Sequence, residues 1–111
     1  MADDASGASP YDLLTDPAYR DAVTDLLGVL AYAELIAFER LAYDARMAPS
    51  LEDKAALARL ATTECGHFQV LDRHLEGMGV EAEKAMAPFV APLEAFHAKT
   101  APSDWEESLV K

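Results

Sequence analysis

The sequence predicts an all-α fold built on an antiparallel hairpin of two long helices, which corresponds to half of a four-helix bundle. Two runs rich in alanine and leucine, about 17–47 and 50–77, have no proline beyond their first residues. Only two or three residues join these runs, and long helices with so short a connection pack antiparallel. Each run also repeats apolar residues at helical spacing, in a stripe too wide for two helices to bury alone.

Local signals place the ends of both helices within a predicted hairpin over residues 16–79. Asp16-Pro17 provides an N-cap followed by proline at the first helical position. Ala48-Pro49 ends the first helix, because a residue before proline disfavours helical geometry. Ser50 begins a weak capping box, and Gly77 and Gly79 mark the end of the second helix.

The remaining segments are less regular. Residues 1–15 predict a flexible acidic tail, and 80–102 a proline-rich connection with a short helix over 93–100. Ser103-Asp104-Trp105-Glu106 predicts a capping box that starts a third helix over 103–111. Because little sequence follows this start signal, we expect the chain to be a fragment of a longer protein, or else to dock this short helix on a partner.

Composition excludes several classes of protein. The 111 residues include 9 Lys+Arg and 20 Asp+Glu, a net charge of −11, which argues against a general nucleic-acid binder. Hydrophobic residues make up 51%, too many for a disordered acidic chain, yet no apolar run is long enough to cross a membrane. A single cysteine and an N-terminus without secretory-signal features favour the cytoplasm.

The two apolar stripes each contain one acidic residue near their centre. At about 100° per residue, apolar side chains surround Glu34 within roughly 60°. These are Val23, Leu27, Leu30, Ala37, Phe38, Leu41 and Ala45. Glu64 has the same position in the second stripe, among Leu57, Leu60, Ala61, His67, Phe68, Leu71, Leu75 and Met78. Glu39, by contrast, faces away from the first stripe.

A buried carboxylate is expected to be protonated, paired or bound to a metal, and neither stripe has a lysine or arginine close to its glutamate. Glu64 and His67 form a Glu-x-x-His motif, whose spacing lets both side chains reach one ion. Di-iron and di-manganese bundles use one glutamate from each of two helices and one such motif from each of two others. The alternative is a pair of protonated or water-bridged acids, or acids paired with a missing segment.

The segments 32–41 and 64–67 resemble the first two helices of ferritin-like di-iron carboxylate proteins. More closely, they resemble a bacterial group similar to tRNA (methylthio)isopentenyladenosine hydroxylase, and 100–105 is similar to that group's entry to helix three. The resemblance covers 17–111, the first half of the bundle. It implies that Glu34 is a terminal ligand, Glu64 a bridging carboxylate and His67 a terminal imidazole, with iron as cofactor and manganese as the alternative.

Other residues admit two interpretations each. Glu94 and His97 form a second Glu-x-x-His on the short segment after Pro92. This segment could fold back and complete a metal site, but a short helix between prolines gives poor support for fixed ligands, so we favour a capping or surface role for His97. His74 lies at the edge of the second stripe and is expected to be a flanking residue. A second apolar strip on the outer face of the first helix would pack against the tail or connection, or form a subunit interface. It contains Val29, Tyr32, Ile36 and Tyr43.

Three functions follow from these features. The first is a non-haem di-iron oxygenase of hydroxylase type, acting with dioxygen on a small molecule or a modified tRNA base. The second is a ferroxidase or iron-storage protein, for which the acidic surface would gather cations. The third is a structural hairpin without metal. The wide stripes predict a homo-oligomer, at least a dimer, in which two copies rebuild the full set of ligands by symmetry.

Overall fold

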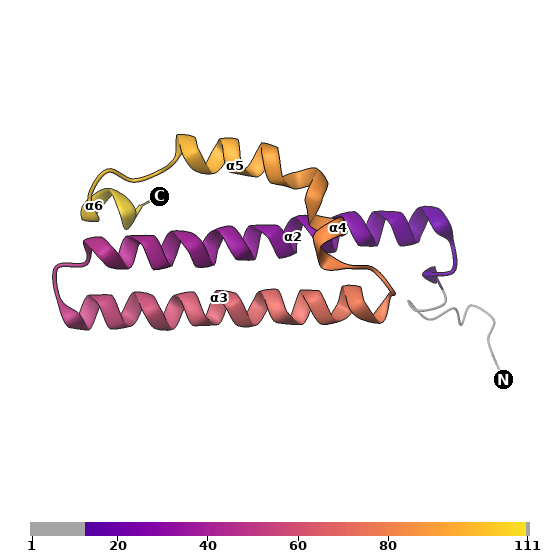
Figure 1. Cartoon of the computed structure of the whole chain (residues 1–111), viewed down its shortest axis with the longest axis horizontal. Coiled ribbons are helices and arrows are strands. Elements are labelled where there is room, and N and C mark those ends of the chain that lie inside the picture. Colours follow the sequence, from indigo (N-terminus) through magenta and orange to yellow (C-terminus); the bar gives the residue numbers. More distant parts are fainter. Residues whose placement is uncertain (1–12, 111) are drawn as a thin grey trace.

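The computed structural model describes residues 13–110, and over this range it contains helices and turns but no strand. Residues 1–12 of the predicted tail lie outside the described range. Two long helices, α2 (Pro17–Asp44) and α3 (Leu51–Gly77), run antiparallel side by side (Figure 1). The all-α hairpin that the sequence predicts is therefore confirmed. No helix in the described part of the chain is both long and apolar enough to cross a membrane.

The ends of both long helices follow from their capping residues. The Asp16 carboxylate accepts a hydrogen bond of 2.9 Å from the Ala18 N–H, and Pro17 is the first helical residue. The turn after α2 tightens into the 3-10 helix η1 (Ala45–Met47). The Ser50 hydroxyl then accepts from the Asp53 N–H at 3.0 Å and starts α3. Asp16 therefore fixes the start of α2, while Ser50 fixes the start of α3 directly after the hairpin turn.

The segment after α3 is more helical than the sequence predicts. It forms α4 (Ala82–Met86), the 3-10 helix η2 (Ala87–Phe89) and α5 (Val90–Lys99). The predicted short helix started at 93, whereas α5 starts at Val90, because Pro92 lies in its first turn, where no helical N–H partner is required. Figure 1 shows that α5 runs back along α2, on the side opposite α3.

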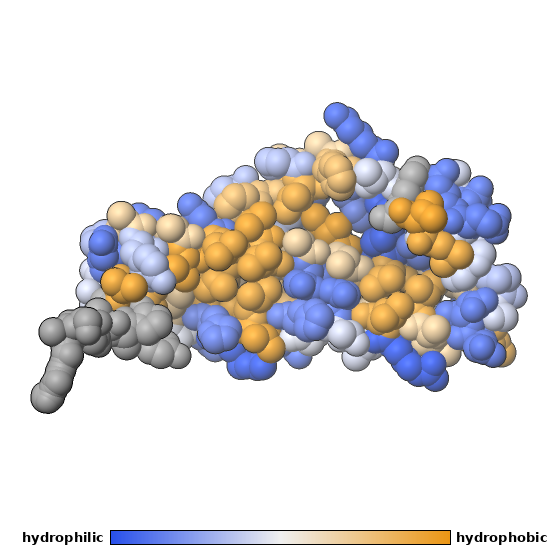
Figure 2. Space-filling model, turned by 180° about the vertical axis from the view of Figure 1, so that it is seen from behind, coloured by the Kyte–Doolittle hydropathy of each residue, from blue (hydrophilic) through white to orange (hydrophobic). Residues whose placement is uncertain are grey.

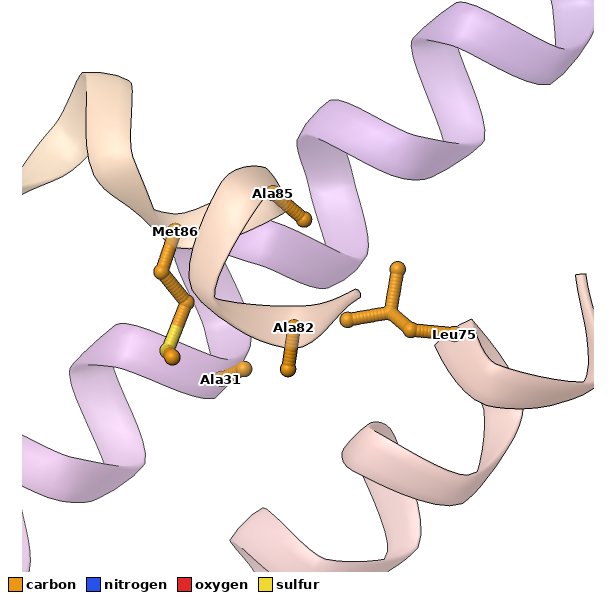
Figure 3. Packing of buried hydrophobic residues seen from close by; sticks show 5 residues of the cluster. All are labelled: Ala31, Leu75, Ala82, Ala85 and Met86. Atoms are coloured by element: carbon orange, nitrogen blue, oxygen red, sulfur yellow. The ribbon is translucent and has the colours of Figure 1, made fainter. Parts of the chain in front are cut away.

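The buried core lies where α4 closes over the two long helices. Ala31 and Leu75 are fully buried, and Ala82, Ala85 and Met86 of α4 pack against them (Figure 3). Gly28 makes this packing possible, since a Cβ atom there would collide with the carbonyl oxygen of Ala85. Small residues on α2 and α4 thus bring two backbones into contact and form a dry core at one end of the hairpin.

The last helix, α6 (Trp105–Ser108), begins one residue later than the predicted capping box implies. Asp104, not Ser103, is the N-cap, and its carboxylate accepts from the Glu107 N–H at 2.8 Å. Glu107 in turn accepts from the Ser103 N–H at 2.9 Å. The capping box is therefore shifted to Asp104 and Glu107, since the Asp carboxylate is at least as good a cap as the Ser hydroxyl.

Candidate metal centre

The structure brings together the three residues that the sequence selects as metal ligands. Glu34 lies on α2, and Glu64 and His67 lie one turn apart on α3. His67 Nδ1 is 3.5 Å from Glu34 Oε2 and 3.6 Å from Glu64 Oε2. One ligand atom of each residue lies within 4.8 Å of the other two. Antiparallel pairing of α2 and α3 is what places the middle of one helix opposite the middle of the other.

These separations suit a shared ion. Two ligand atoms bound to one first-row metal at about 2.1 Å lie about 3.0–3.4 Å apart. The observed distances of 3.5 and 3.6 Å therefore need only small side-chain adjustments. Two carboxylates and one imidazole also form a donor set that iron and manganese accept. The residues therefore fit the metal that the sequence resemblance implies, while their role as ligands stays a prediction.

The electrostatics of Glu34 indicate an incomplete site. Its Oε2 atom is buried, and no described residue gives it a hydrogen bond. The adjacent Glu64 carboxyl, through hydrogen bonding to the protonated form and through charge repulsion, raises the pKa of Glu34, and burial raises it further. His67 opposes this shift. Without a cation, the neighbouring Glu64 carboxyl therefore disfavours the charged form of Glu34. A bound cation would stabilise that charged form and would also give the buried Oε2 atom a partner.

The face that carries these ligands is open. The side chain of His67 is 56% exposed, and those of Glu34 and Glu64 are each 27% exposed. Apolar residues that stay exposed flank the ligands on both helices, namely Leu26, Leu30, Phe38, Leu60 and Val70. Figure 2 shows a broad hydrophobic band on the back of the molecule, interrupted by hydrophilic residues. We call the surface formed by Glu34, Glu64, His67 and these exposed apolar residues the ligand face.

The second Glu-x-x-His lies elsewhere. Glu94 accepts a hydrogen bond of 2.9 Å from the Tyr32 hydroxyl, and Arg40 donates to the His97 carbonyl at 3.0 Å and contacts its Nδ1 at 3.2 Å. Both residues of α5 therefore interact with α2, and the three-ligand group of the described chain does not include them. His74 is exposed on α3 and also lies outside that group.

The second apolar strip, on the outer face of α2, was predicted either to pack against the connecting segment or to form a subunit interface. Tyr32 bonds to Glu94, and Ile36 lines a cavity with residues of α5, so these two pack on the connecting segment. Tyr43 is 53% exposed, and its ring lies 5.4 Å from the Arg46 guanidinium carbon. Packing against the connection therefore accounts for Tyr32 and Ile36, while a subunit contact through Tyr43 stays a prediction.

A cavity of about 450 Å³, which no local sequence pattern indicates, lies between α2, α5 and α6. Ile36, Leu93 and Phe96 form apolar walls, while Arg40 and Asp44 contribute polar groups. Ala33 and Ala37, which flank Glu34 on α2, also line it. The cavity thus adjoins the ligand face along one helix. Its volume is in the range of small-molecule sites.

Asp44 is the unusual residue of this cavity. It is only 4% exposed, and no described residue gives its Oδ1 atom a hydrogen bond. Burial raises the pKa of Asp44, although the nearby charges of Arg40 and His97 oppose the shift. An acid just before a turn would ordinarily be solvated. The only sequence signal was that Asp44 and Arg40 lie four residues apart on one side of a helix.

Comparison with known proteins agrees with this architecture. A family described as a ferritin-like domain of actinomycetes matches residues 17–111. No curated protein matches the chain. The family match confirms the predicted ferritin-like superfamily, while the narrower resemblance to the tRNA hydroxylase-like group stays a prediction.

Proposed function

Because the chain belongs to the ferritin-like domain family of actinomycetes, we propose that it holds iron through Glu34, Glu64 and His67. In this proposal it contributes half of the ligands of a non-haem di-iron oxygenase that hydroxylates an organic substrate. The observation that carries the proposal is that Glu34, Glu64 and His67 bring three possible ligand atoms together in the middle of the hairpin. One carboxylate oxygen of this group, Glu34 Oε2, is buried without a hydrogen bond. Bound iron would supply the binding and reduction of dioxygen.

Each of the three proposed ligands, and the two helices that carry them, has a distinct role in this function. Glu34 and Glu64 would neutralise the cation, and His67 would add a neutral nitrogen donor. The rigid α2–α3 pair fixes the spacing of the three, since both helices are capped. The apolar surroundings of the ligands would exclude water once the ligand face is covered.

The cavity beside α2 favours the oxygenase over iron storage. A hydroxylase needs a space for an organic substrate close to its metal, whereas a storage protein does not. The cavity of about 450 Å³ has apolar walls and adjoins Glu34 through Ala33 and Ala37. The net charge of −11 favours a small molecule over direct contact of this half with a tRNA backbone.

A ferroxidase or iron-storage function is the second candidate, supported by the strongly acidic composition. A metal-free structural hairpin is the third. It would leave Glu34 Oε2 without a hydrogen bond, with only the longer ion-pair contact of 3.5 Å from His67 Nδ1, and a buried acceptor without a hydrogen bond costs about 1–3 kcal/mol. For this reason we rank the structural hairpin last.

Oxygen uptake separates the two metal-dependent functions. The protein is loaded anaerobically with Fe(II) and mixed with dioxygen, and oxygen consumption is recorded as further Fe(II) is added. For the oxygenase we expect uptake to stop after one turnover unless an external reductant is supplied. Uptake that grows in proportion to each Fe(II) addition, with ferric mineral formed, would instead establish the ferroxidase.

Two variants control this measurement. Glu64→Ala removes a proposed ligand and should abolish the fast uptake. Glu76→Ala removes an exposed carboxylate from the opposite face of the same helix and should leave uptake unchanged. Equal uptake in wild type and Glu64→Ala would contradict both metal-dependent functions at this site.

A further inference from the structure

The ligand face is a surface that the described chain does not cover. α4 packs over part of the hairpin and α5 runs along α2 on the side opposite α3, yet apolar residues beside the proposed ligands stay exposed (Figure 1). Leu60, on α3, is 52% exposed, and Leu30, on α2, is 44% exposed. Each precedes a proposed ligand by four residues, Glu64 and Glu34 respectively, and so lies on the same face as that carboxylate.

The site on this face carries half of a dinuclear set. One glutamate comes from α2 and one Glu-x-x-His from α3, whereas a complete centre uses two of each. A copy related by two-fold symmetry supplies the same residue types, because an isologous interface joins identical surfaces. The missing ligands are therefore the ones that a second copy carries.

The position of the ligands along the hairpin favours this arrangement. Thirteen residues of α3 precede Glu64 and thirteen follow it. Glu34 is also well inside α2, with seventeen residues before it and ten after it. A two-fold axis through the site would therefore overlay the two hairpins along most of their length. The exposed leucines on either helix would then be buried against their counterparts.

We infer that a second copy of this chain docks on the ligand face, that each copy contributes Glu34, Glu64 and His67 to a shared two-metal site, and that metal drives the docking. This inference rests on the proposed function, since it identifies the partner that completes the same site.

Charge explains why docking depends on metal. Two copies bring four carboxylates into one apolar space, and each copy has a net charge of −11. Burying four unpaired carboxylates together is strongly unfavourable. Two divalent cations carry four positive charges and balance them. The metal-free chains should therefore repel one another despite their apolar faces, and metal should join them.

The test is sedimentation velocity of the 111-residue chain with EDTA and with Fe(II) under anaerobic conditions, together with metal content of each species. We expect a monomer in EDTA and a dimer with Fe(II) that retains roughly one iron per chain. A monomer that retains iron would overturn the inference and leave the proposed function standing. A monomer without retained iron would contradict both, and a dimer that persists in EDTA would overturn the coupling to metal.

A matched pair of variants tests the surface itself. Leu60→Gln places a polar group on the ligand face without touching a ligand, and Leu51→Gln makes the same change at a residue that is 82% exposed on the opposite face of α3. We expect Leu60→Gln to weaken dimerisation and iron retention at least tenfold while circular dichroism shows unchanged helix content. Leu51→Gln should behave as wild type. Equal loss in both variants, or in neither, would overturn the proposed interface.

Discussion

The packed end of the hairpin and its middle are built from the same two helices but differ in how their side chains are satisfied. Where α4 closes on α2 and α3, alanines and a glycine give a dry core with backbones in contact. In the middle, the same two helices place two acids and a histidine on an uncovered apolar face. The first region gains stability from close packing. The second region keeps polar groups where only a cation and a covering partner would satisfy them, which is the pattern expected of a functional site.

The largest effect should come from removing the imidazole ligand. Saturating Fe(II), at about 100 times its Kd, should stabilise the wild type by about 2.7 kcal/mol through binding to the folded state alone. His67→Ala should lose most of this metal-induced rise in Tm, yet keep the metal-free Tm, because its side chain is half-exposed. His74→Ala, seven residues further along α3, is the control and should retain the rise. A rise that survives in His67→Ala would show that the metal binds elsewhere.

The packing of α4 on α2 should be disrupted by the addition of a single methyl group. Gly28→Ala places a Cβ atom against the backbone carbonyl of Ala85, which cannot move without shifting α4. We expect a loss of about 1–3 kcal/mol in the free energy of unfolding, measured by urea denaturation. Gly66→Ala, in open space between two ligands on α3, should instead stabilise by up to about 1 kcal/mol through helix propensity. If both variants were stabilised, the close approach of α4 to α2 would be wrong.

The attachment of α5 depends on one side chain. Arg40 donates to the Thr100 carbonyl at 3.1 Å and to the His97 carbonyl at 3.0 Å. Arg40→Ala should cost about 1–2 kcal/mol, since these hydrogen bonds come from a charged donor. It should also speed amide exchange in α5 more than in α3. Arg59→Ala, an exposed position on α3, should change neither. If amide exchange became faster by the same factor in all helices, Arg40 would not be attaching α5 specifically.

The smallest effect is the pH dependence of the metal-free protein. Because burial raises the pKa of Asp44 from its ordinary value of 3.8, the folded state binds more protons than the unfolded state between these two values. Stability should therefore increase as pH falls through the raised pKa, and level off below the ordinary one. Asp44→Asn should reduce this gain in the free energy of unfolding by about 1 kcal/mol at most, as measured by urea denaturation from pH 7 to 4. Asp25→Asn, which is exposed, should keep the full gain.

The sequence predicted the hairpin and the three candidate ligands that it brings together, because both follow from one helical period. Placing Glu34 and Glu64 in the middle of apolar stripes required only 100° per residue, and the short turn then made them face each other. α4 was not predicted, because a five-residue helix between Gly79 and Pro88 is too short to show a helical period. The one sequence feature that relates to α4 is Gly28, which weakens the middle of a long helix but leaves room for the Ala85 backbone.

Tertiary contacts decided the remaining details. The cavity beside α2 depends on where α5 returns, and no local pattern fixes that path. The uncovered ligand face was likewise implied only by the width of the stripes, because burial depends on which other segment or copy is present. Sequence reasoning therefore identified the residues of the candidate site better than their surroundings.

Iron content per chain tests the central claim most directly. The wild type, Glu64→Ala and Glu76→Ala are loaded anaerobically with Fe(II), desalted and analysed for iron and protein. If Glu34, Glu64 and His67 form the site, the wild type and Glu76→Ala should retain roughly one iron per chain, and Glu64→Ala almost none. Equal retention in all three proteins, or no retention in the wild type, would contradict a metal centre at the middle of the hairpin.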